Sequence, residues 1–88
     1  MTTVDKDDAQ DILRETLYGM AVPMCSVPQE VMIESAENEE GAIQLVLHAG
    51  ESDKGRLIGR QGRTIEAMRT VLHSVSKNLG VRVHTRVE

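Results

Sequence analysis

The most informative stretch of the chain is Gly55-Arg56-Leu57-Ile58-Gly59-Arg60-Gln61-Gly62-Arg63-Thr64-Ile65. Gly59 and Gly62 frame two polar residues, and glycine lets a backbone turn sharply while leaving no Cβ in the way of an approaching chain. A long helix is predicted to begin after Gly62, and the first N–H groups of a helix form a site suited to phosphate. Three arginines surround this site with permanent positive charge, namely Arg56, Arg60 and Arg63. The stretch predicts an anion-binding loop between two helices.

Apolar residues flank the loop, with Leu57 and Ile58 before it and Ile65 after it. A groove with an aliphatic floor and a cationic lip suits single-stranded nucleic acid, whose bases lie on the floor while the backbone crosses the glycines. The alternative interpretation of Gly59 and Gly62 is a plain tight turn. The two long polar residues between them favour the functional interpretation, because a purely structural turn prefers Asn, Asp or Ser.

The first half of the chain predicts a helix followed by a β-hairpin. Residues 5–20 carry apolar side chains at helical spacing, namely Ala9, Ile12, Leu13, Leu17 and Met20. The connection Ala21–Gln29 contains two prolines, so the helix is expected to end near Met20 or Ala21, where this connection begins. Residues 30–36 and 42–48 read as short strands joined by a polar turn over 37–41.

The second half predicts two helices and a strand. Ala49–Asp53 reads as a loop that ends in good helix N-caps, and 54–58 as about one helical turn. The longest helix is expected over 63–79, with Gly80 as its C-cap. Residues 81–87 alternate strictly and form the last strand.

The element order α-β-β-α-α-β predicts an α+β fold in which three helices pack on one face of a three-stranded mixed sheet. A helical crossover joins strand 42–48 to strand 81–87, which implies parallel neighbours. The first helix shares the face of the other two, because a thin core needs one common interior. The 88 residues suit a single domain over 1–88, with an N-terminal helix-strand extension at about 5–36 and a core motif at about 42–88.

Composition excludes several classes of protein. Apolar residues make up 40% of the chain and charged residues 27%, which is typical of a globular and not a disordered domain. No apolar run reaches the ~20 residues of a membrane helix, and Met1–Asp5 lacks the basic start and apolar stretch of a signal peptide. The lone Cys25 makes neither an internal disulfide nor a multi-cysteine zinc site. We therefore expect a cytoplasmic protein with no membrane partner.

The net charge of −4 hides an uneven distribution. Residues 1–49 hold two Lys/Arg and ten acids, a net −8, whereas residues 50–88 hold eight Lys/Arg and four acids, a net +4. Such asymmetry indicates a local anion-binding face. Uneven scatter of charge on a small protein is the alternative explanation.

The glycine loop resembles that of the KH domain, whose signature is Ile-Gly-x-x-Gly between two helices. Ile58-Gly59-Arg60-Gln61-Gly62 matches it fully, and the element order resembles the bacterial, type II version of the fold. The run from Gly55 to Arg63, followed by Ala67-Met68-Arg69-Thr70, is similar to the small stand-alone bacterial KH proteins of the KhpA family. The connection Ala21–Gln29 is longer than is usual in that family.

The resemblance implies a cytoplasmic protein that binds single-stranded RNA as an RNA chaperone or post-transcriptional regulator, without enzymatic activity or cofactor. It also implies pairing with a second KH protein of the KhpB (Jag) type, self-association as a homodimer, and a link to cell-shape regulation. The implied RNA-binding residues are Arg56, Leu57, Ile58, Gly59, Arg60, Gln61, Gly62, Arg63, Ile65 and Arg69. The alternative function is a KH-fold protein-interaction module that works in a complex with another KH protein without touching RNA.

The remaining polar residues carry weaker predictions. Arg69 either lines the groove or forms a solvated or salt-bridged pair. Arg82, His84 and Arg86 share one face of the last strand, which we interpret as a solvated surface or a partner contact rather than the RNA groove. The histidines lack metal-ligand spacing, and no serine, histidine and carboxylate lie close enough in sequence to indicate a catalytic triad, so we expect no metal site and no enzyme.

Overall fold

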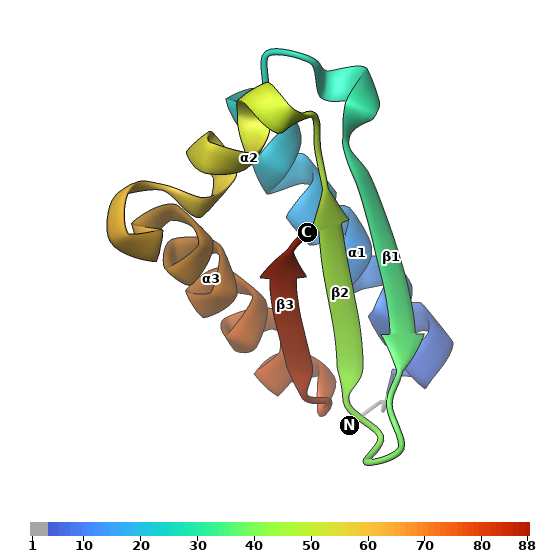
Figure 1. Ribbon diagram of the computed structural model, residues 1–88. Helices are drawn as coiled ribbons and strands as arrows, with labels where there is room; N and C mark the ends of the chain where they lie inside the picture. The colour runs from blue at the N-terminus through green and yellow to red at the C-terminus, as the bar shows by residue number, and fades with distance from the viewer. Residues whose placement is uncertain (1–3) are drawn as a thin grey trace.

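The computed structural model describes residues 4–88 (Figure 1). The prediction about a signal peptide falls partly on residues 1–3, which lie outside the described residues. Single turns of 3-10 helix interrupt the connection after the first helix and form the glycine loop. In chain order the elements are α1 (Lys6–Ala21), η1 (Val22–Met24), η2 (Pro28–Glu30), β1 (Met32–Glu37), β2 (Ile43–His48), α2 (Glu51–Ile58), η3 (Arg60–Gly62), α3 (Arg63–Leu79) and β3 (Val83–Val87).

The sheet has the strand order β1-β2-β3. β1 and β2 pair antiparallel with Ser35 opposite Leu45, and β2 and β3 pair parallel with Leu45 opposite Thr85. Helices α1, α2 and α3 lie on one side of the sheet and leave its other face uncovered (Figure 1). The predicted α+β fold, its hairpin and its parallel crossover are all confirmed.

The core is aliphatic and centres on β2. Side chains that point from β2 toward the helices meet apolar side chains from all three helices. The fully buried leucines and isoleucine are Leu13, Leu17, Ile43, Leu45, Leu47, Leu57 and Leu72. Each such side chain stabilises the fold by roughly 1.5–3 kcal/mol relative to an exposed one.

The buried stripe of α1 does not include every apolar residue at helical spacing. Ala9, Leu13, Leu17 and Ala21 are buried at four-residue intervals, whereas Ile12 is 38% exposed. Successive residues rotate by about 100° around a helix, so Ile12 lies off the line through Ala9 and Leu13. Ile12 therefore belongs to the apolar spacing of the helix but not to its buried stripe.

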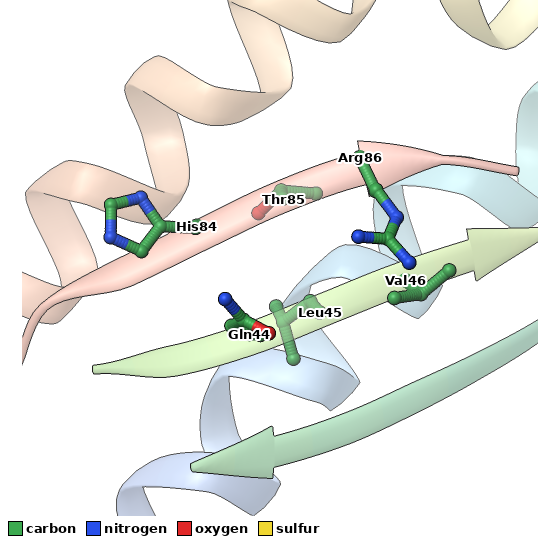
Figure 2. Close-up of a pocket in the computed structure, with 6 residues that line it drawn as sticks. All are labelled: Gln44, Leu45, Val46, His84, Thr85 and Arg86. Atoms are coloured by element: carbon green, nitrogen blue, oxygen red, sulfur yellow. The ribbon is translucent and has the colours of Figure 1, made fainter. Parts of the chain in front are cut away.

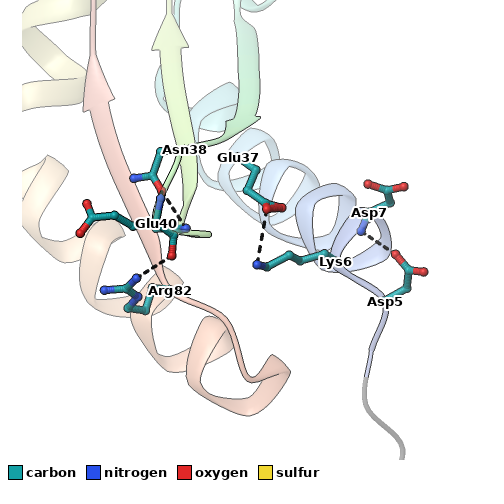
Figure 3. Close-up of polar contacts among 8 residues, drawn as sticks. Asp5, Lys6, Asp7, Glu37, Asn38, Glu40 and Arg82 are labelled. Atoms are coloured by element: carbon teal, nitrogen blue, oxygen red, sulfur yellow. Dashed lines mark hydrogen bonds and ion pairs between the residues drawn. The ribbon is translucent and has the colours of Figure 1, made fainter.

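The turn between β1 and β2 is closed by its own side chains (Figure 3). The Asn38 Oδ1 atom accepts hydrogen bonds from the backbone N–H groups of Glu40 and Ala42, each at 2.9 Å. Arg82 donates to the carbonyl oxygen of Glu40 at 3.0 Å, and Lys6 pairs with Glu37 at 3.5 Å. These contacts join the hairpin to the start of β3 and to α1.

Candidate nucleic-acid interface

The loop between α2 and α3 has left-handed backbone at three of its four positions. The φ angles are +79° at Gly59, +57° at Gln61 and +75° at Gly62. Gly59 combines its positive φ with a ψ of 170°, a region that essentially only glycine occupies. A Cβ at Gly59 would lie 2.3 Å from the Thr64 Oγ1 atom and 2.7 Å from the Thr64 backbone nitrogen. Glycine is therefore required at position 59 by conformation and by space.

Gly62 meets a different environment. A Cβ built there finds no heavy atom of the described chain within 4 Å, so the backbone faces open space. Gly62 also serves as the N-cap of α3, and no side chain of residues 4–88 caps this helix. The helix thus presents its N-terminus, with its partial positive charge, at a bare stretch of backbone.

The two residues between the glycines project outward. Arg60 and Gln61 are exposed. Within residues 4–88 the Arg60 guanidinium has no hydrogen bond or ion pair, whereas the Gln61 Oε1 atom accepts a bond from Arg63 at 3.3 Å. The structure thus brings three of the predicted polar residues together around the glycine backbone.

The apolar residues beside the loop are mostly hidden. Leu57 is fully buried and Ile65 nearly so, whereas Ile58 is 40% exposed. Of the three side chains predicted to form an apolar floor, Ile58 alone is available at the surface. Leu57 and Ile65 support the loop from the core, because both side chains belong to the buried hydrophobic cluster.

Helix α2 is fixed by Asp53, a residue that sequence reasoning placed wrongly as an N-cap. The helix begins at Glu51 with Gly50 as its N-cap, and Asp53 is a fully buried residue of its first turn. Its carboxylate accepts hydrogen bonds from Ser26 N at 2.9 Å, Ser26 Oγ at 2.8 Å and Val27 N at 3.0 Å. These bonds, led by the one from the Ser26 backbone, hold the pKa of Asp53 below its usual range although burial opposes them.

The signal for a buried Asp53 was present in the sequence. Asp53 and Leu57 stand four residues apart and share the inward face of α2. We refer to the contacts of Asp53 with Ser26 and Val27 as the Asp53 clamp.

Arg56 also connects α2 to the segment that follows α1. It donates to the Met24 carbonyl oxygen at 3.3 Å and lies 4.0 Å from the Asp53 carboxylate, yet its side chain remains 60% exposed. Burial raises the pKa of the neighbouring Cys25 thiol, and the Asp53 charge adds to the effect. The thiol therefore stays protonated at neutral pH and is a weak nucleophile.

Arg69 lies at the seam between α3 and β3 rather than at the glycine loop. Its Nε donates to the Thr85 carbonyl oxygen at 2.9 Å, and its guanidinium also pairs with Glu66. β3 is an edge strand, so this bond reaches the unpaired side of the sheet. Of the two predictions for Arg69, the salt-bridged one describes its contacts.

The last strand orients its side chains as predicted. Val83 and Thr85 are buried, while His84 and Arg86 are exposed on the uncovered face of the sheet; Arg82, which directly precedes the strand, is exposed as well. Figure 2 shows a shallow hollow on this face between β2 and β3. In the described part of the chain, no group of three or more His, Cys, Asp or Glu side chains has the arrangement of a metal site. No helix of residues 4–88 combines the length and the hydropathy of a membrane span.

Comparison with known families identifies the family that shares this loop and this fold. Residues 14–87 match the family described as KhpA/KhpB, KH domain. The chain belongs to this family. Among curated KhpA/KhpB relatives, the RNA-binding protein KhpA of Chlamydia pneumoniae is 38% identical over 75 residues, which cover 85% of this chain and 95% of the relative. The protein of the same name from Streptococcus pneumoniae serotype 4 is 35% identical over 65 residues, covering 74% of this chain and 81% of the relative.

The fold of this KhpA/KhpB family member also occurs in larger proteins of known structure. Era in complex with MgGDPNP and nucleotides 1506–1542 of 16S ribosomal RNA aligns with a TM-score of 0.57 and 19% identity. The alignment covers 90% of this chain but 28% of the Era chain. Era of Aquifex aeolicus bound to GDP.AlF4− gives a TM-score of 0.58 at 18% identity, over 98% of this chain and 31% of the other. These likenesses are of fold, and they agree with the predicted type II KH arrangement.

Proposed function

We propose that the protein binds single-stranded RNA through the loop Gly59-Arg60-Gln61-Gly62. The observation that carries the proposal is the open, left-handed backbone at Gly62, at the N-terminus of α3 and beside Arg60; within residues 4–88 no side chain caps that helix and the Arg60 guanidinium has no partner. A KH loop of this form clamps the backbone of about four nucleotides. The relatives named for RNA binding support the proposal.

Within this proposal the residues have separate roles. The backbone around Gly62 and the side chains of Arg60 and Gln61 contact the sugar-phosphate chain, with Arg56 and Arg63 as phosphate neighbours. Ile58 contacts a base, Leu57 and Ile65 hold the loop from below, and Arg69 stabilises the seam that borders the groove. The role is one of binding, so the proposal assigns no catalytic residue.

The test is a fluorescence-anisotropy titration of a labelled mixed-sequence single-stranded RNA at two salt concentrations. The variant Arg60→Asp/Gln61→Asp removes the contacts and adds repulsion, and aspartate tolerates the left-handed backbone at position 61. We expect binding that weakens with salt in the wild type and is lost in the variant. Unchanged affinity in the variant would contradict the proposal.

A matched control applies the same change of charge elsewhere. Lys77 and Asn78 are exposed near the C-terminal end of α3, far along the helix from the loop. The variant Lys77→Asp/Asn78→Asp alters the net charge by the same amount as the loop variant. It should keep most of the RNA affinity, and circular dichroism should show both variants folded.

We further propose that the protein works in the cytoplasm as an RNA chaperone or post-transcriptional regulator that affects cell shape. In this proposal it pairs with a KhpB-type KH protein or with a second copy of itself. The family description, which joins KhpA and KhpB, supports such a partner. Pairing would also raise the modest affinity of one small site by avidity. Light scattering of the purified chain, alone and mixed with a KhpB-type protein, tests the partnership separately from RNA binding.

A further inference from the structure

We propose a second RNA-contacting surface on the uncovered face of the sheet, where Arg82 and Arg86 bind phosphates of an RNA that extends beyond the nucleotides held at the glycine loop. This inference rests on the proposed function. We call the surface formed by Arg82, His84 and Arg86 the β3 row.

The β3 row is built by β3 and the residue before it. His84 and Arg86 alternate with the buried Val83 and Thr85 within the strand, and Arg82 directly precedes the strand. Alternate residues of a strand are about 6.6 Å apart, so the two arginines, four residues apart in the chain, are separated by at most roughly 13 Å of backbone. The row thus presents cationic groups in sequence order along the end of the chain, a form that can follow an extended phosphate backbone.

The surroundings of the β3 row lack opposing charge on the two strands that carry it. The facing positions on β2 are Gln44, opposite His84, and Val46, opposite Arg86. The hollow between these strands, about 80 Å³ in volume, is lined by Gln44, Leu45, Val46, His84, Thr85 and Arg86 (Figure 2). None of these lining residues is acidic. The lining of this hollow therefore carries the positive charge of Arg86 and no carboxylate.

The two arginines differ in how their charge is used. Arg82 donates to the neutral carbonyl oxygen of Glu40 and has no carboxylate partner within residues 4–88. Arg86 is held by Glu88, with its Nη2 atom 2.9 Å from the Glu88 carboxylate. Glu34 of β1, which pairs with Val46 of β2, is a further acid beside this face and contacts His48. The guanidinium of Arg82 can therefore bind a phosphate without first leaving a carboxylate, whereas a phosphate must compete with Glu88 for Arg86.

The position of β3 connects the row with the loop. β3 is the edge strand on the side of α2 and α3, and α2 contacts it (Figure 1). Arg69 already lies on this edge through its bond to Thr85. An RNA that leaves the glycine loop along the seam between α3 and β3 therefore meets Arg69 at the edge and the β3 row beyond it.

RNA length provides the test. One labelled RNA spans about four nucleotides, the reach of a single loop, and another is about three times as long. The variant Arg82→Ala/Arg86→Ala should bind the short RNA like the wild type and the long RNA several-fold more weakly. Because each phosphate contact on a single strand contributes about 0.7 to the slope of log affinity against log salt, that slope should fall by about 1.4 for the long RNA alone.

Further variants separate charge from shape. Arg82→Lys/Arg86→Lys should restore the salt dependence, because it keeps both charges. Glu88→Gln should strengthen binding of the long RNA, since it frees Arg86. The control Lys6→Ala/Arg14→Ala removes two charges from α1, on the acidic half of the chain, and should weaken the long RNA much less than the β3-row variant.

The outcomes distinguish this inference from the proposed function. If the loop variant loses binding while Arg82→Ala/Arg86→Ala binds both RNAs normally, the β3 row is no RNA site and the proposed function stands. If the wild type binds neither RNA, both fail. If the β3-row variant changes only the association with an acidic protein partner and leaves the salt slope for long RNA intact, the row serves proteins and the inference is overturned.

Discussion

The two sharp turns of this protein, the hairpin turn at Asn38–Gly41 and the loop at Gly59–Gly62, solve one geometric problem in opposite ways. Both use a glycine at positive φ, +82° at Gly41 and +79° at Gly59. In the hairpin turn, Asn38 satisfies two backbone N–H groups, and Arg82 covers the Glu40 carbonyl. The polar groups of that turn are used up within the protein.

The polar side chains between the two glycines of the loop do not satisfy backbone groups in the described part of the chain. Arg60 and Gln61 cap no backbone group, and the space at Gly62 is empty to 4 Å within residues 4–88. A turn that only reverses the chain has no need of long exposed side chains between its glycines. The comparison teaches that the destination of a turn's polar groups, more than the glycines, separates a structural turn from a binding loop.

The largest effect is expected from Gly59→Ala, which breaks the binding loop. The new Cβ would meet the Thr64 backbone nitrogen at 2.7 Å, and the backbone conformation is nearly closed to alanine. We expect roughly 2–4 kcal/mol of lost stability from strain and overpacking together with loss of RNA binding. Urea denaturation measures the loss of stability, and the anisotropy titration measures the loss of RNA binding.

The matched change in the hairpin turn, Gly41→Ala, sharpens this prediction. Its Cβ would meet Lys6 Nζ at 2.9 Å, the far end of a flexible side chain that moves aside. Only backbone strain of about 1–2 kcal/mol remains, and RNA affinity is unchanged. Equal losses of stability at the two glycines would contradict the distinction between the turns.

The Asp53 clamp tests whether the glycine loop depends on its attachment to the rest of the protein. Asp53→Asn keeps the shape but removes the charge that holds Ser26 and Val27, so we expect a melting temperature lower by several degrees and weaker RNA binding. A stability control, Leu79→Ala at the far end of α3, should lower the melting temperature without a comparable loss of affinity.

The clamp also predicts a pH dependence of stability. The pKa of Asp53 is lower in the folded chain than its ordinary value of 3.8, so its contribution is present above that value. As the pH falls below it, the unfolded chain takes up the proton first, and the contribution is lost through the folded pKa. Urea denaturation between pH 7 and pH 3 should show a smaller loss of stability on acidification in Asp53→Asn than in the wild type.

The sequence could predict what depends on neighbours along the chain. Helix α3 runs from Arg63 to Leu79 as expected, because its apolar spacing and the following Gly80 are local signals. The Asp53 clamp was missed because its partner Ser26 lies 27 residues away, and the local preference of aspartate for N-caps pointed elsewhere. In the same way, the bond from Arg69 to Thr85 depends on how α3 docks on β3, which no local pattern encodes.

Removing side chains should affect stability at the hairpin turn and RNA affinity at the glycine loop. Asn38→Ala deletes two hydrogen bonds to backbone N–H groups and should cost about 1 kcal/mol of stability with no effect on RNA. Arg60→Ala/Gln61→Ala should leave stability nearly unchanged, because neither side chain supports the fold, and should weaken RNA binding. A stability loss in the loop variant as large as that of Asn38→Ala would mean that the loop residues are structural.

The smallest effect is expected at the surface beside the hairpin turn. Lys6 and Glu37 form an ion pair at 3.5 Å whose two side chains are nearly half exposed. Such pairs contribute about 0–1 kcal/mol, and salt screens them further. Lys6→Ala should therefore change the urea midpoint by less than Asn38→Ala does, and the difference from the wild type should vanish at high salt. A salt-insensitive loss as large as that of Asn38→Ala would show that Lys6 closes the turn through packing against Gly41, and that the hairpin depends on α1 as the glycine loop depends on Asp53.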